Sequence, residues 1–145
     1  MKIGIEVEGN KTLVKGLKDA VQSMLEFVEE EIYNTTQEIA TKAVSRAPVD
    51  LGILKNSNYV KLDRMYGETG FIVKYAPYVE FGTGGKVNIP AGLEEYASQY
   101  KGQGLRQVNL PARPFLFNSA FEEQVKLTNK LNKDFDSASL TIRLL

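Results

Sequence analysis

Hydrophobic residues recur with a helical period over most of the first third of the chain. From Leu13 to Ala47 they fall mainly three, four or seven positions apart, so they trace one stripe along a helix. Such a helix would be roughly 50 Å long at about 1.5 Å per residue. The stripe weakens at Thr35 and Thr36, where we expect a bend or a change of packing partner. Pro48 ends the helix, because proline disfavours the α conformation at the residue before it.

Four shorter segments have strand-like patterns, and the first and the last of them alternate polar and apolar side chains with the period of two of half-buried strands. These segments are residues 2–8, about 56–63, about 69–75 and 139–145. The middle two are close enough in the chain to form a hairpin, and we expect its turn at 64–68 with Gly67 inside it.

Glycines mark the ends of two further elements. Asp50 followed by Gly52 predicts a turn after the long helix, because Asp can bond its own backbone and Gly can take a positive φ. Residues 76–83 predict one helical turn, with Pro77 at its first position and Gly82 ending it. A long loop rich in glycine and proline follows at about 84–113, and loops of this length inside a domain are usually functional or mobile.

A second helix is expected to begin within 114–120 and to end near Asp136. Ser119 and Glu122 have the spacing of a capping box at its start. A short amphipathic helix at 93–100 interrupts the preceding loop. The predicted fold is therefore one α+β domain over residues 1–145, with one long N-terminal helix and a C-terminal helix packed on a small, mainly antiparallel sheet.

The composition excludes much of enzyme chemistry. The 145 residues include no cysteine and no histidine, which removes thiol nucleophiles, thiolate metal sites and the usual general base at neutral pH. We therefore expect no enzyme, no metal and no cofactor. The 18 basic and 18 acidic residues balance, whereas proteins that neutralise nucleic-acid phosphates usually carry an excess of base. With no run of about 18 apolar residues and no signal-peptide pattern, we expect a soluble intracellular protein without membrane contact.

Glu80 is the acidic residue with the most unusual surroundings, because Tyr75, Tyr78 and Phe81 are its neighbours in the sequence. A carboxylate in such an apolar setting either has a raised pKa suited to proton transfer or is paired. Pairing is far more common, so we expect Glu80 to bond Arg113 or nearby backbone N–H groups.

Two other patterns resemble binding sites for phosphate or cations, but neither is interpreted as one. The segment 82–86 lacks the spacing of a phosphate-binding loop. The acidic run at 29–31 is interpreted as a solvated helix face and not as a cation site.

The loop at 84–113 offers an alternative function. Tyr96 and Tyr100, with Lys101 and Arg106 nearby, could stack on bases and bind nucleic acid without sequence preference. The structural alternative is that these tyrosines pack on the loop's own short helix or on a neighbouring subunit. Lys86 belongs to the same possible subunit-contact loop.

Three segments together resemble the head–tail joining and tail-completion proteins of tailed phages, the group that includes the lambda minor tail protein Z. Residues 47–57 resemble the helix-ending "aPvdTGxLrxS" segment of that family, residues 75–83 its "YAxyvEfGT" segment, and residues 111–116 its "xaxPFLxPA" segment. Leu51 and Asn118 depart from the family pattern, which has Thr and Pro there. The residues that carry the resemblance are Pro48, Asp50, Gly52, Leu54, Tyr75, Ala76, Glu80, Gly82, Thr83, Arg113, Pro114 and Phe115.

The resemblance implies a structural role in the virion. Proteins of this family are added at the top of the tail or the bottom of the neck and join the tail to a filled head. It therefore implies partners among tail, neck and connector proteins, a homo-oligomer with a hexameric ring as the expected form, and a chain that can be monomeric before docking. It places the protein in the virion and, during assembly, in the host cytoplasm. No catalytic residue belongs to this role.

Overall fold

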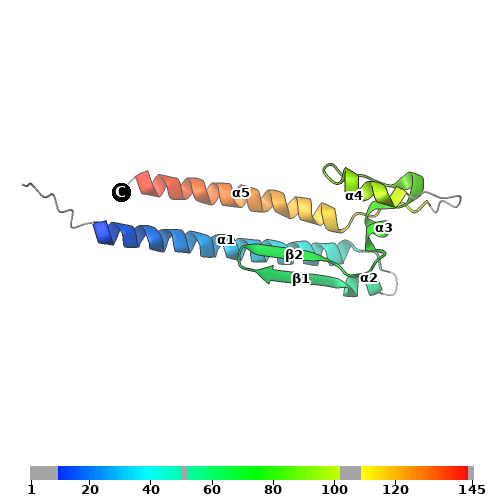
Figure 1. Ribbon diagram of the computed structural model, residues 1–145, viewed down its shortest axis with the longest axis horizontal. Coiled ribbons are helices and arrows are strands. Elements are labelled where there is room, and N and C mark those ends of the chain that lie inside the picture. Colours follow the sequence, from blue (N-terminus) through cyan, green and yellow to red (C-terminus); the bar gives the residue numbers. More distant parts are fainter. Residues whose placement is uncertain (1–9, 50–51, 102–108, 144–145) are drawn as a thin grey trace, which may run out of the picture.

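The computed structural model describes residues 10–49, 52–101 and 109–143, and its longest element is the 37-residue helix α1 (Asn10–Arg46). A second long helix, α5 (Leu116–Arg143), runs beside α1 in the opposite direction (Figure 1). The long helix predicted from the hydrophobic period is confirmed. It continues without a break through Thr36, whose buried hydroxyl donates a hydrogen bond to the Ile32 carbonyl.

A two-stranded antiparallel hairpin packs against α1. Its strands are β1 (Asn58–Asp63) and β2 (Tyr66–Phe71). The hairpin was predicted, but its turn consists of Arg64 and Met65, and Gly67 lies within β2. A Cβ at Gly67 would lie 2.0 Å from the Thr36 hydroxyl oxygen, so the glycine is needed for close approach to α1 and not for the turn.

Short helices gather at one end of the molecule, beside the start of α5 (Figure 1). Gly52 and Gly82, with φ of 72° and 76°, flank two of them as predicted, while Pro77 stands at the second helical position and not the first. The predicted helix at 93–100 is present as α4 with η2. These elements are α2 (Ile53–Asn56), α3 (Ala76–Phe81), η1 (Gly84–Lys86), α4 (Glu94–Ser98) and η2 (Gln99–Lys101).

Two predictions about the C-terminal part are wrong. The chain remains helical to Arg143 where a strand was expected. Leu140 and Leu144 alternate with polar residues, but they are also four positions apart, and so short a run cannot distinguish the two periods. Ser119 lies inside α5, with its hydroxyl donating to the Phe115 carbonyl, so it does not cap the helix. The predicted strand at 2–8, together with Asp50, Leu51 and Arg106, lies outside the described residues.

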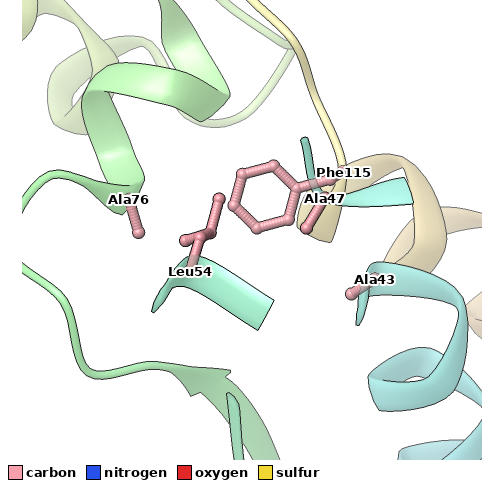
Figure 2. Close-up of a cluster of buried hydrophobic side chains, with 5 residues drawn as sticks. All are labelled: Ala43, Ala47, Leu54, Ala76 and Phe115. Atoms are coloured by element: carbon pink, nitrogen blue, oxygen red, sulfur yellow. The ribbon is translucent and has the colours of Figure 1, made fainter. Parts of the chain in front are cut away.

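The hydrophobic core is small and lies where the short helices meet α1. Figure 2 shows the Phe115 ring among side chains from α1, the residues after it, α2 and α3. The buried residues of this cluster are Ala43, Ala47, Leu54, Ala76 and Phe115.

The contact between α1 and α5 is largely ionic. Lys42 pairs with the buried Glu123, and the guanidinium of Arg46 donates to Glu122 over 2.8 Å. Lys130 pairs with Glu31 over 2.6 Å. Because Glu31 is buried in this pair, the interpretation of residues 29–31 as a solvated face is wrong for that residue. Within the described residues, no helix is long and apolar enough to span a bilayer.

Candidate docking groove

The three segments that carry the family resemblance meet at the end of the molecule and line one surface groove. Its volume is about 470 Å³. Most of the lining is apolar or aromatic, and among the described lining residues only Arg113 carries a permanent charge. The first segment contributes Pro48, Ile53 and Leu54, the second Tyr75, Tyr78 and Val79, and the third Pro111 and Arg113, with Leu110 beside them. We call this surface the docking groove.

Gly82 allows the third segment to cross directly over the end of α3. A Cβ at this position would lie 2.7 Å from three backbone atoms, those of Leu110, Ala112 and Lys86, and the residue also has a positive φ. Thr83 then joins the two segments, because its backbone N–H donates to the Leu110 carbonyl and its hydroxyl accepts from the Leu110 N–H. Glycine is therefore needed at position 82 because the backbone of another segment lies against it, and Thr83 hydrogen-bonds that segment.

Glu80 fixes the end of the third segment through hydrogen bonds to its backbone. Its buried carboxylate accepts hydrogen bonds from the backbone N–H groups of Phe115, Leu116 and Phe117, at 2.8, 3.0 and 3.0 Å. A carboxylate at a helix N-terminus satisfies N–H groups that have no partner within the helix and interacts favourably with the helix dipole. The prediction that Glu80 is paired is confirmed through backbone N–H groups.

The side chain of Arg113 lines the docking groove and forms no described salt bridge with Glu80. Its backbone N–H donates to the Val79 carbonyl over 2.9 Å, which fixes the segment, while its exposed side chain lines the groove. No salt bridge joins Glu80 and Arg113 in the described part of the chain.

Some of the motif residues are therefore buried and support the fold, whereas others line the docking groove. Leu54, Ala76 and Phe115 are buried, and the Phe115 ring meets Phe71 edge-on at 4.9 Å between ring centroids. Two exposed lining residues, Tyr75 and Arg113, are motif positions. The groove is also lined by residues that sequence analysis did not single out as sites: Ile53, Tyr78, Val79, Leu110 and Pro111. Apolar residues directly beside motif positions, such as Ile53 beside Gly52, were the available indication.

Two aromatic residues of the loop, Tyr96 and Tyr100, pack against α3. The Tyr100 ring stacks on Phe81 at 5.7 Å and meets Tyr78 edge-on at 5.0 Å, and Tyr96 also contacts Phe81. Burial, together with a hydrogen bond to Tyr96, raises the pKa of Tyr100 to about 12. The two tyrosines thus pack on each other and on α3 of the same chain, in agreement with the prediction that they have a structural role.

Among the basic residues of the same loop, Arg106 lies outside the described residues. Lys86 is exposed in η1, and Lys101 closes η2. Within the described ranges, no cluster of acidic side chains could hold a metal ion. Comparison with protein-family models, curated proteins and solved structures finds no match for this chain.

Proposed function

We propose that this protein is a structural component of a tailed-phage virion that docks other proteins at the head–tail junction. The observation that carries the proposal is the convergence of the three resembling segments, distant in sequence, on the docking groove. Several apolar side chains lie together in this one groove in contact with solvent, and such grouped exposure, unlike single exposed apolar residues, is typical of a protein-binding surface.

The groove has the chemistry of a protein-binding surface. Ile53, Tyr78 and Leu110 are 51%, 46% and 49% exposed. Aromatic residues and arginine are enriched where interfaces gain most of their binding energy, and charged residues are depleted at interface centres. The nine described lining residues include no carboxylate that could act as a general base. Adhesion is the activity that this lining supports.

The test is complementation of a phage from which the gene has been deleted. We expect the deletion to yield separate filled heads and complete tails in electron micrographs. The wild-type protein supplied in trans should restore joined, infective particles, whereas Ile53→Asp and Leu110→Asp should not, because each places an uncompensated charge in the interface.

Ile72→Asp is the matched control, since Ile72 is 73% exposed and lies outside the groove. It should complement normally, and circular dichroism should show all three variants folded. The proposal is wrong if folded groove variants complement as well as the control, or if the deletion leaves intact particles. Salt-sensitive DNA binding that disappears on neutralising Lys86 and Lys101 would favour the nucleic-acid alternative instead.

A further inference from the structure

The docking groove combines an apolar lining with one positive charge that has no ionic partner. The side chain of Arg113 is exposed and forms no salt bridge within the described residues. Glu80, the acidic residue of α3, is buried and accepts hydrogen bonds from the start of α5 instead. The groove is therefore complementary to a segment that carries several apolar side chains and a carboxylate.

Residues 2–8 of the chain have this combination of side chains. Three β-branched apolar residues alternate there with polar or small ones: Ile3, Ile5 and Val7. Two of the alternating residues, Glu6 and Glu8, are carboxylates, and Lys2 is the one basic residue of the segment. We call residues 2–8 the apolar–acidic segment.

The other strand-like segment outside the sheet, at 139–145, lacks the complementary charge. Its only charged side chain is that of Arg143, which has the same sign as Arg113. The chain is also helical as far as Arg143. Charge therefore favours the apolar–acidic segment as the occupant of the groove.

The apolar–acidic segment cannot reach the groove of its own chain. It precedes Asn10, where α1 begins, whereas the groove is lined by Pro48 and later residues, beyond the end of α1. The 37 residues of α1 span about 55 Å, and the short helices around the groove gather at its far end (Figure 1). Residues 2–9 span at most about 28 Å even when fully extended. The occupant must come from another copy.

We propose that the apolar–acidic segment of one copy of the chain binds the docking groove of a second copy. This contact rests on the proposed function, in which the groove binds protein, and it names the occupant. Alternate side chains of an extended segment point to opposite sides. When Ile5 and its two apolar neighbours enter the groove, Glu6 and Glu8 remain on the solvent side, where the exposed Arg113 is available to pair with them.

The contact is heterologous, because two different surfaces at opposite ends of α1 meet in it. After each contact one groove and one segment remain unoccupied, so copies add in one direction until the assembly closes as a ring or continues as a filament. A segment of seven residues is much smaller than the roughly 20–30 residues per side of a standard interface. A single contact should therefore be weak, with a dissociation constant on the order of 10–100 μM, and ring closure strengthens it by joining several contacts.

Sedimentation velocity of full-length variants tests the head-to-tail contact. Ile5→Asp damages the segment and leaves the groove intact, whereas Ile53→Asp damages the groove and leaves the segment intact. At about 0.5 mM, well above the expected dissociation constant, the wild type should form species larger than dimers and each variant should be monomeric. An equimolar mixture of the two retains one productive contact, so it should form a 1:1 complex that grows no further.

Ile72→Asp is the matched control, because Ile72 is exposed and lies outside the groove, and it should associate like the wild type. A mixture that stays monomeric would overturn the proposal. So would a folded single variant that associates as the wild type does, or a wild-type chain that is monomeric at about 1 mM.

A labelled peptide with the sequence of residues 2–9 tests the occupant without relying on assembly. Fluorescence anisotropy should show saturable binding to the full-length Ile5→Asp variant, whose groove no other copy fills. Adding Arg113→Glu to that variant should weaken binding about tenfold, because attraction becomes repulsion. A peptide with both Glu6→Lys and Glu8→Lys should recover the binding to this double variant. A peptide of residues 137–145 should not bind, and failure of the 2–9 peptide to bind would refute the contact.

These outcomes are distinguishable from those of the complementation experiment. If the groove variants fail to complement while the 2–9 peptide does not bind, the groove docks a different protein and only the head-to-tail contact is refuted. If the folded groove variants complement as well as Ile72→Asp, the proposed function is refuted whatever the peptide does.

Discussion

At the residue scale, a single carboxylate determines where α5 begins. Glu80 comes from α3, 35 positions before Phe115, and supplies the cap that a local side chain usually provides. Because this cap comes from another element, α5 begins three residues before Ser119, where the capping-box spacing placed its start. The pairing of Glu80 could be predicted from its apolar neighbours in sequence. The start of α5 at Leu116 falls within the predicted range of 114–120, whereas the residue that caps it could not be predicted, because that cap depends on a contact between distant segments.

Removing this cap should destabilise the fold. Glu80→Ala leaves one buried and two part-buried N–H groups without their acceptor, and we expect the free energy of unfolding in urea to fall by about 3 kcal/mol. Glu80→Gln retains an acceptor but loses the charge, so it should cost about 1 kcal/mol. Glu95→Gln, on the exposed face of α4, should change the value by less than about 0.5 kcal/mol. Equal effects at Glu80 and Glu95 would contradict the capping role.

At the scale of elements, the hairpin lies so close to α1 that one position tolerates no side chain. Sequence reasoning placed Gly67 in a turn, because glycine between two alternating runs usually marks one. In the fold Gly67 lies against the Ile32 and Thr36 side chains, and the positive φ of 57° falls on Met65 instead. The existence of the hairpin followed from two neighbouring strand-like runs, whereas its register depended on packing against α1, whose Thr36 lies 31 positions before Gly67.

Two glycine substitutions should therefore have opposite effects. Gly67→Ala forces the hairpin away from Thr36 and should lower the free energy of unfolding by about 2 kcal/mol. Gly16→Ala has open space around its Cβ and lies within α1, so it should raise the same quantity by about 0.5–1 kcal/mol. Thermal and urea unfolding of the two variants would give the comparison. A stabilising Gly67→Ala would show that the hairpin does not pack as described.

At the scale of the whole molecule, ion pairs join the second half of α1 to the first half of α5. Burial alone would raise the pKa of Glu123, but hydrogen bonds from Lys126 and Lys42 outweigh it and lower the pKa to about 2. A hydrogen bond from Arg46 lowers the pKa of Glu122 as well. Glu38 acts in the opposite direction, since its hydrogen bond to Glu123 raises its own pKa. The helix pair is thus most strongly joined when Glu122 and Glu123 are ionised.

This arrangement predicts an acid-sensitive fold. The folded pKa of Glu123 lies below the ordinary value of 4.5, so its stabilisation is present above about pH 4.5 and is lost as the pH falls toward 2. Glu123→Gln should lower the free energy of unfolding at pH 7 by about 2 kcal/mol, because Lys42 and Lys126 lose a buried charged partner. The variant should also lose less stability than wild type between pH 5 and about 2.5. A pH profile parallel to that of wild type in thermal melts would contradict this assignment.

The residues of the docking groove could be predicted from the sequence only in part. Each of its three segments was identified from its own residues, and Gly52, Gly82 and Glu80 were given roles that the structure bears out. The convergence of these segments depends on the chain returning to α3 through Leu110, which no local pattern encodes. Periodicity located the apolar stripe of α1, but it gives only the apolar face of a helix and not the partner that covers it.

The bond between Glu80 and the first turn of α5 also has a mechanical consequence. It couples the six-residue α3, which forms one wall of the groove, to a helix of 28 residues that is about 42 Å long. Each degree of rotation at the capped end displaces the other end by about 0.7 Å. That distant end lies alongside the first half of α1 (Figure 1), so any rotation of α3 that is passed to α5 has to move α5 against the ion pairs that join it to α1.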